Sequence, residues 1–301
     1  MTPPDRSRVA TEAVHAGSAE LAPGDVAGLL SLMSREDRAV PEAVARSLDR
    51  ITALVEAIAP RFTRGGRIFY AGAGTSGRLG VLDASECPPT FLTEPGRVVG
   101  VIAGGDRALR ESSEHLEDVA AEAASDLAGF DIGADDTVIG ITAGGTTPYA
   151  LAAVAYGRER AALAALLTCG EPPSGFVVEH LVQIDTGPEI VAGSTRLKAG
   201  TATKLALNMI STGVMATAGK VHRGLMVDVS ATNQKLRDRA ARIVASLTGR
   251  DRGASVELLD DAGGRVKTAV VMHRLGVPRE RAERTLDEAG WDLDAALGGR
   301  Q

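Results

Sequence analysis

The sequence predicts an α/β protein in which a parallel sheet is flanked by helices, with a small helical subdomain at the C-terminal end. Short β-prone apolar runs alternate with longer segments whose apolar residues recur at helical spacing, and such alternation predicts parallel strands joined by crossover helices. After residue 250 only short helical patterns follow. We expect a polar arm over residues 1–22 that carries little chemistry of its own, one domain over residues 23–250, and a helical subdomain over residues 251–301.

The expected strands are short, apolar and bounded by glycine or polar residues. They cover residues 68–71, 98–103, 137–141 and 163–167, and residues 182–184 are a candidate for a further edge strand. The expected helices cover residues 25–33, 41–62, 198–219 and 233–247, followed by short ones at 256–261, 266–275, 279–289 and 293–297. The helix over 198–219 is apolar around most of its circumference, which predicts burial in a core or at a subunit interface.

Composition excludes several classes of protein. The chain has 301 residues, 44% of them hydrophobic, which is enough for a sizeable core. A net charge of −6 argues against general nucleic-acid binding, which needs a basic face. Cys87 and Cys169 are too few for a disulfide framework and have no metal-ligand spacing. Because no signal segment or membrane-spanning run is evident, we expect a cytoplasmic protein without a membrane or nucleic-acid partner.

A loop of small residues follows the first expected strand, with the sequence GAGTSG over residues 72–77. Its glycines allow close approach of a ligand to the backbone, and Thr75 and Ser76 add hydroxyl groups where a following helix would begin. These features fit a phosphate group. Glycine-rich turns are also common in α/β proteins, and this one lacks the G-x-G-x-x-G spacing, so an ordinary turn remains the alternative.

A second loop of the same kind follows the third expected strand. It runs TAGGTTP over residues 142–148, and its proline is well placed to open a helix. Because ligands bind beyond the carboxyl ends of strands in such sheets, the two loops can face one crevice. The predicted phosphate-binding residues on these loops are Thr75, Ser76, Gly77, Thr142, Gly145 and Thr147.

Three other features are candidates for chemistry or capping. Glu86 precedes Cys87, Pro88 and Pro89, and the two prolines are expected to stiffen the segment and prevent further helix. The run over residues 110–118 is rich in charge, which is typical of a solvated helix face. Residues 193–202 open the long apolar helix, where Ser194 and Thr195 could simply serve as N-caps.

Together these motifs resemble the N-acetylmuramic acid 6-phosphate etherases, which have the sugar isomerase (SIS) fold. The resemblance rests on GAGTSGRLG and LDASECPPTF around the first loop, on AGG followed by EHLED, and on GSTRLKAGTA before the long helix. In the second loop Thr142 and Thr147 match the SIS pattern, whereas Gly144 replaces a common serine and Thr146 stands where etherases often have arginine. The similarity covers about residues 8–300 and implies a flavodoxin-like three-layer sandwich and a homodimer.

The resemblance implies cleavage of the D-lactyl ether of N-acetylmuramic acid 6-phosphate, giving N-acetylglucosamine 6-phosphate and D-lactate in peptidoglycan recycling. Elimination followed by hydration needs two proton-transfer groups and no metal or other cofactor. By resemblance these are Glu86 and Glu117, with Glu114 as the position most easily confused with Glu117. We assign Glu86 as the acid, because apolar neighbours favour a neutral carboxyl, and Glu117 as the base. The start of the long helix, with Ser194 and with Arg196 or Lys198, is expected to help close the sugar site.

Two other functions remain open from the sequence. A sugar-phosphate isomerase would share the phosphate loops and a glutamate base but would not need an acid at the C3 oxygen. A non-catalytic sensor, like the SIS-fold regulatory protein that binds glucokinase, would share the fold. The C-terminal pattern from residue 275 to residue 298 resembles three-helix bundles of the ubiquitin-associated type, but we do not infer ubiquitin binding from it.

Overall fold

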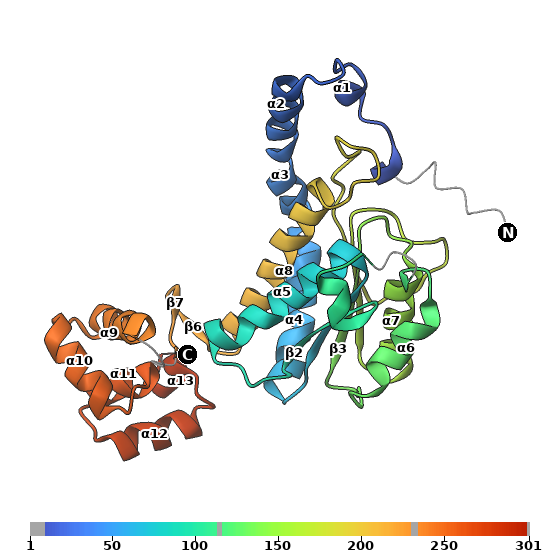
Figure 1. Cartoon of the computed structure of the whole chain (residues 1–301). Helices are drawn as coiled ribbons and strands as arrows, with labels where there is room; N and C mark the ends of the chain where they lie inside the picture. The colour runs from blue at the N-terminus through green and yellow to red at the C-terminus, as the bar shows by residue number, and fades with distance from the viewer. Residues whose placement is uncertain (1–9, 113–115, 230–233, 300–301) are drawn as a thin grey trace. The chain divides into compact units, whose positions relative to one another are not determined.

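The computed structural model describes residues 10–112, 116–229 and 234–299 (Figure 1). Contacts divide the chain into two compact units. The first contains Met1–Ser85 and Gly96–Ser211, and the second contains Glu86–Pro95 and Thr212–Gln301. In the described part of the chain, no helix is both long and apolar enough to cross a membrane.

The first unit is built on a parallel sheet of five strands. The strands are β1 (Ile68–Gly72), β2 (Val98–Ile102), β3 (Thr137–Thr142), β4 (Leu163–Thr168) and β5 (His180–Gln183). Their order is β2-β1-β3-β4-β5, so the expected strands and the edge strand are confirmed. In this flavodoxin-like order the chain changes direction across the sheet between β1 and β3, and the loops after these two strands diverge to leave a crevice.

Helices cover both faces of the sheet, which makes the expected three layers (Figure 1). One face packs against α6 (Ala120–Ala128) and α7 (Pro148–Glu159) through a core that includes Phe69, Val138 and Tyr149. The other face packs against α4 (Leu48–Thr63) and α5 (Gly74–Phe91). The remaining helical elements of the first unit are η1 (Ala10–Glu12), α1 (Ala16–Ala19), α2 (Val26–Asp37), α3 (Val40–Ala45), η2 (Gly105–Leu109) and most of α8 (Lys198–Thr217).

Two expected helix boundaries were wrong. The single helix expected over residues 41–62 is interrupted between α3 and α4, where the Ser47 hydroxyl donates to the Gln183 carbonyl of β5 at 2.7 Å. Helix α5 does not stop before its prolines but continues through Pro88 and Pro89 to Phe91. Each proline removes only one amide donor, and the amide of Leu92 still donates to the Pro88 carbonyl at 2.9 Å.

The second unit is helical. It contains the hairpin β6 (Val221–His222) and β7 (Leu225–Met226), and the helices α9 (Gln234–Thr248), α10 (Arg252–Asp261), α11 (Val266–Leu275), α12 (Arg279–Glu288) and α13 (Leu293–Ala296). Helix α9 buries Ala240 and Val244 in one core with Leu259 of α10 and Val270 of α11. The domain boundary expected at residue 250 stays a prediction.

A buried carboxyl joins α5 to α8 within the first unit. Asp83 accepts a hydrogen bond from the Ser211 hydroxyl at 3.1 Å. Burial raises the pKa of Asp83 to about 6, although hydrogen bonds with Ser211 and Tyr70 oppose the shift. The folded protein therefore binds this proton more tightly than the unfolded chain, so the contribution of Asp83 to stability is lost as the pH rises from about 4 through 6.

Asp83→Asn should consequently raise the free energy of unfolding at pH 7.5, by up to roughly 3 kcal/mol at about 1.4 kcal/mol per pKa unit. At pH 4 the variant and the unmodified chain should differ little, because the carboxyl is then protonated. Urea unfolding followed by circular dichroism at both pH values measures the difference. Asp37→Asn, at the exposed end of α2, is the control. An equal change at both pH values would contradict a raised pKa at Asp83.

Candidate active site

A cavity of about 270 Å³ lies in the first unit, beyond the carboxyl ends of β1 and β3. It is lined by the segments that follow these two strands, by the turn before α6, by residues that precede α8 and by the N-terminal arm. Since open α/β sheets bind ligands at the point where their strand order reverses, this cavity is the candidate active site.

The first loop contributes the start of α5. The backbone at Gly74 has φ of +53°, a conformation that favours glycine, and Thr75 and Ser76 in the next positions line the cavity. The first amides of a helix have no intrahelical acceptor and carry the positive end of the helix dipole, so this turn suits an anion. Gly77 does not line the cavity. A side chain there would meet the Gly72 carbonyl and Ile102, so Gly77 allows α5 to approach the sheet.

The second loop brings different residues to the cavity than we expected. Gly144, Thr146 and Thr147 line it together with Ala143. Thr142 is buried, with its hydroxyl 2.8 Å from that of Thr147, and it accepts from the Gly145 amide at 3.3 Å. Gly145 has φ of +85°, and a side chain there would collide with the Glu171 carbonyl. Thr142 and Gly145 therefore shape the loop, while Thr146 and Thr147 face the ligand space.

Glu117 reaches the same cavity from the turn that precedes α6. Its carbonyl accepts from the amide of Tyr149 at 3.1 Å, which ties the turn to the start of α7. The Tyr149 hydroxyl donates to Asp126 at 2.6 Å, and burial raises the pKa of this hydroxyl, so it remains a donor. Helix α6 begins at Ala120, after this turn. Glu114 and His115 lie outside the described residues.

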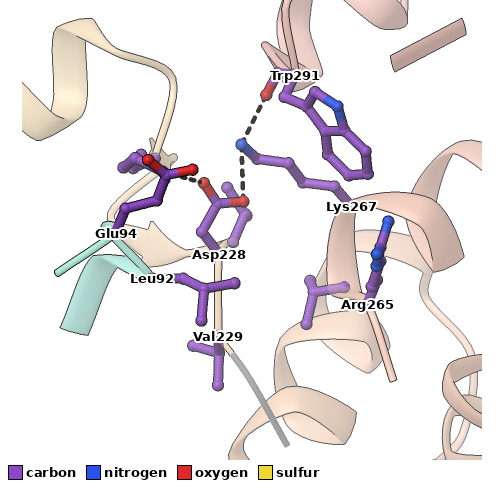
Figure 2. Close-up of a pocket in the computed structure, with 10 residues that line it drawn as sticks. Leu92, Glu94, Asp228, Val229, Arg265, Lys267 and Trp291 are labelled. Atoms are coloured by element: carbon purple, nitrogen blue, oxygen red, sulfur yellow. Dashed lines mark hydrogen bonds and ion pairs between the residues drawn. The ribbon is translucent and has the colours of Figure 1, made fainter. Parts of the chain in front are cut away.

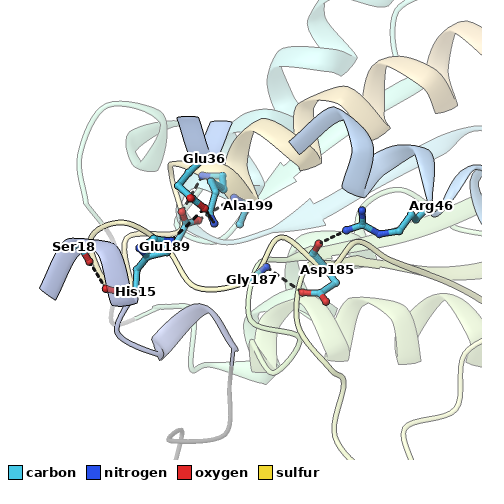
Figure 3. A network of polar contacts seen from close by, with 9 residues as sticks. His15, Ser18, Glu36, Arg46, Asp185, Gly187, Glu189 and Ala199 are labelled. Atoms are coloured by element: carbon cyan, nitrogen blue, oxygen red, sulfur yellow. Dashed lines mark hydrogen bonds and ion pairs between the residues drawn. The ribbon is translucent and has the colours of Figure 1, made fainter. Parts of the chain in front are cut away.

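The segment that precedes α8 lines the cavity through Gly193 and Thr195, and Ser194 is not among the lining residues. Lys198 lies elsewhere. It is 4% exposed, and its ammonium is 3.5 Å from a carboxylate oxygen of Glu36, which also lies 3.2 Å from the His15 imidazole. This network is shown in Figure 3. Although burial opposes the shift, His15 and Lys198 hold the pKa of Glu36 below its usual value.

The N-terminus of α8 is capped by the carboxylate of a buried glutamate. Glu189 is 0% exposed and accepts from the amides of Lys198 and Ala199 at 3.0 and 2.9 Å (Figure 3). These two amides are therefore not available to a substrate anion. The starts of α5 and α7, in contrast, bring the hydroxyl-bearing residues Thr75, Ser76, Thr146 and Thr147 to the cavity.

A SIS-domain family and several named etherases are similar to this chain. Residues 50–158 match the family described as the glucokinase regulatory protein N-terminal SIS domain. The N-acetylmuramic acid 6-phosphate etherase of Streptomyces avermitilis is 50% identical to the chain, over 95% of this chain and 93% of its own length. The etherase of Rubrobacter xylanophilus is 50% identical over 96% and 95%, and that of Gloeobacter violaceus is 47% identical over 98% and 96%.

The chain belongs to the N-acetylmuramic acid 6-phosphate etherase family. The expected family and its SIS-type fold are thus confirmed. Among solved structures, a phosphoheptose isomerase from Francisella tularensis aligns with 62% of this chain and 98% of its own at 16% identity and a TM-score of 0.47. A similarity this low carries no conclusion about function.

Of the two glutamates that the etherase resemblance implies, only Glu117 lines the cavity. Glu86 lies on the part of α5 assigned to the second unit, and its side chain is exposed. We expected apolar surroundings for the Glu86 carboxyl, and this expectation was wrong. Cys87 is buried in the core, whereas the Glu86 side chain is exposed to solvent. The acid role of Glu86 stays a prediction.

No pattern in the sequence indicated the contribution of the arm. Thr11 and Glu12 line the cavity, yet they lie in a polar stretch without periodicity and do not follow a strand. Among the described lining residues, Glu12 and Glu117 carry the ionisable side chains and no lysine or arginine is present. Backbone amides and hydroxyl groups of the lining residues that the structure describes are therefore the donors that could hold an anion. No three His, Cys, Asp or Glu side chains in the described ranges are grouped as metal ligands.

A second cavity, of about 400 Å³, lies within the second unit (Figure 2). The Lys267 ammonium, which is 2% exposed, lies 2.8 Å from one carboxylate oxygen of Asp228 and donates to the Trp291 carbonyl at 2.6 Å. Lys220 lies 3.0 Å from the other oxygen of Asp228. Burial lowers the pKa of Lys267. Because each of these three side chains already has a partner within the protein, we interpret the network as structural.

Proposed function

We propose that this chain is a carbon–oxygen lyase that cleaves the D-lactyl ether of N-acetylmuramic acid 6-phosphate. The products are N-acetylglucosamine 6-phosphate and D-lactate. The observation that carries the proposal is the meeting of Glu117 with the start of α5 and the second loop in one cavity, in a chain about half identical to named etherases over nearly its whole length. No metal or other cofactor is needed for this reaction.

The proposed reaction is an elimination followed by hydration. In the open-chain sugar the C1 aldehyde acidifies the proton on C2. The Glu117 carboxylate takes this proton, a double bond forms between C2 and C3, and the C3–oxygen bond to the lactyl group breaks. A proton from an acid, to which we assign Glu86, goes to the departing lactyl oxygen. Water then adds its hydroxyl group at C3 and a proton at C2, which gives the product sugar.

The first turn of α5 and the second loop are proposed to hold the 6-phosphate. This position would fix one end of the substrate, so that C2 can lie beside Glu117. We also propose a homodimeric, cytoplasmic enzyme of N-acetylmuramate catabolism in peptidoglycan recycling. Exposed Leu82 and Met209, on α5 and α8 of the first unit, are apolar side chains that a second subunit could cover.

The direct test is incubation of the full chain with N-acetylmuramic acid 6-phosphate and an enzymatic assay for D-lactate. Release of lactate and N-acetylglucosamine 6-phosphate in equal amounts is expected. Unphosphorylated N-acetylmuramic acid should react far more slowly. Interconversion of an aldose phosphate and a ketose phosphate without lactate would instead indicate an isomerase. Binding of sugar phosphates without any turnover would indicate a sensor.

Ser76→Ala should mainly weaken binding of the phosphate, since it removes one hydroxyl group that faces the cavity. Loss of a hydrogen bond to a charged group costs about 1.5–3 kcal/mol, so KM should rise roughly 10- to 100-fold with little change in kcat. Ser85→Ala is a matched control, because Ser85 is an exposed serine of the same helix whose hydroxyl donates to the Leu82 carbonyl. An unchanged KM for Ser76→Ala would exclude phosphate contact by this side chain.

A further inference from the structure

The N-terminal arm forms part of the wall of the candidate active site. The short helix η1 ends at Glu12, and the amide of Gly193 donates to the carbonyl of Thr11 at 2.9 Å. The Thr11 side chain is only 1% exposed, so it anchors this part of the arm in the first unit. Thr11, Glu12 and Gly193 all line the 270 Å³ cavity. The arm is thus seated where it can contact a ligand.

Glu12 presents a carboxylate to this cavity. One of its oxygens lies 3.0 Å from the position that a Cβ atom on Gly193 would take, so the carboxylate lies directly against the glycine. The side chain is exposed, and within the described part of the chain it forms no ion pair or hydrogen bond. No lysine or arginine is among the described residues that line the cavity with it. A ligand in the cavity can therefore supply the donor that this carboxylate accepts.

Charge restricts which part of a sugar phosphate Glu12 can meet. An ionised carboxylate only accepts hydrogen bonds, and it repels a phosphate dianion at short range. The start of α5 and the second loop offer neutral hydrogen-bond donors to a phosphate, and Glu12 lies in neither segment. The remaining donors of an amino-sugar phosphate are its hydroxyl groups and its amide N–H. A hydrogen bond from such a group to a carboxylate is charge-assisted and about twice as strong as a neutral one.

We propose that Glu12 is a specificity residue that accepts hydrogen bonds from the hydroxyl or amide N–H groups of the phosphorylated sugar. It distinguishes a sugar phosphate from a bare phosphate, and it takes no part in proton transfer. The proposal rests on one part of the function proposed above, namely that the cavity binds a sugar phosphate.

The test compares two ligands and two variants of the full chain by titration calorimetry. The ligands are N-acetylglucosamine 6-phosphate and inorganic phosphate. Glu12→Ala should weaken binding of the sugar phosphate about 10- to 100-fold and leave inorganic phosphate within about 2-fold. Ser76→Ala should weaken both ligands by similar factors. Glu20→Ala, an exposed acid of the same arm outside the cavity, should change neither and serves as the control.

The kinetic constants of Glu12 variants distinguish a role of Glu12 in substrate binding from a role in proton transfer. Glu12→Gln keeps an acceptor oxygen, so its KM should lie between those of the unmodified chain and Glu12→Ala, with kcat within about 3-fold. If Glu12→Gln instead lowers kcat by roughly two orders of magnitude, as loss of a general acid or base does, the proposal is overturned and Glu12 is a proton-transfer group. Equal weakening of both ligands by Glu12→Ala, or no weakening, would overturn it as well.

The outcome is independent of the etherase assay. If the unmodified chain binds N-acetylglucosamine 6-phosphate but releases no lactate from the muramic acid derivative, the proposed function fails while the comparison of the two ligands still decides the role of Glu12. If the unmodified chain binds the sugar phosphate no more tightly than inorganic phosphate, the proposal for Glu12 fails.

Discussion

Glu117→Gln should stop both lactate release and the exchange of the C2 proton with solvent. The family resemblance implies two glutamates, and of these Glu117 lines the cavity together with the loops after β1 and β3. The amide keeps the size of the side chain but cannot take a proton at neutral pH, so the first step of the elimination is lost. Proton NMR of the substrate in deuterium oxide follows the C2 signal and free lactate in the same sample.

Glu86→Gln should behave differently if Glu86 is the acid. Ether cleavage should slow by roughly the 10²- to 10⁴-fold typical of a lost general acid, while exchange at C2 continues. Glu111→Gln is the control, since Glu111 is an exposed acid paired with Arg107 on the segment before Glu117. If Glu86→Gln loses exchange and Glu117→Gln keeps it, the two roles are reversed. Normal cleavage by both variants would show that the reaction uses other groups, and Glu114 would be tested next.

Sequence patterns predicted the sheet well because its central strands, β1, β3 and β4, are buried on both faces. Such strands are continuous apolar runs, as in residues 137–141 and 163–167, and they stand out from polar surroundings. The position of the candidate site followed from the same pattern, because the loops after the first and third strands meet at the reversal of strand order. Thr75, Ser76 and Thr147 line this cavity, and their contact with a phosphate stays a prediction.

Sequence patterns did not predict the positions of Lys198 and Glu12, because these positions depend on contacts between residues far apart in the chain. Lys198 was expected near the sugar, but its buried ammonium pairs with Glu36, which lies 162 positions earlier in the chain. Glu12 enters the cavity because the Thr11 carbonyl binds the Gly193 amide, again across most of the first unit. Neither pairing has a local pattern. The continuation of α5 through Pro88 and Pro89 was missed because the rule for proline is local, whereas the rest of that helix is fixed by packing.

Asp228→Asn should destabilise the second unit by about 3–5 kcal/mol, the cost of removing one partner from a buried ion pair. Asp228 is the carboxylate that lies between the ammonium groups of Lys267 and Lys220, at 2.8 and 3.0 Å. Lys267 is 2% exposed, so without Asp228 its charge would remain buried with only the Trp291 carbonyl as a partner in this network.

Lys267→Met should cost much less, because it removes the buried charge while Lys220 remains beside Asp228. The double variant should recover part of the loss caused by Asp228→Asn. Asp260→Asn breaks an exposed pair with Arg237 and should cost no more than about 1 kcal/mol, which makes it the control. The single tryptophan, Trp291, belongs to this unit, so its fluorescence during urea unfolding reports the stability of this part of the chain.

The loss in Asp228→Asn should also depend on pH. Burial lowers the pKa of Lys267 below its usual value of 10.5, so the unfolded chain binds this proton more tightly than the folded protein. The contribution of Lys267 therefore favours folding more as the pH rises toward 10, and the cost of Asp228→Asn should shrink over that range. The double variant with Lys267→Met should lose this dependence. Equal losses in the free energy of unfolding for Asp228→Asn and Lys267→Met, unchanged with pH, would contradict this interpretation. They would show that Asp228 is not needed to stabilise a buried charge on Lys267.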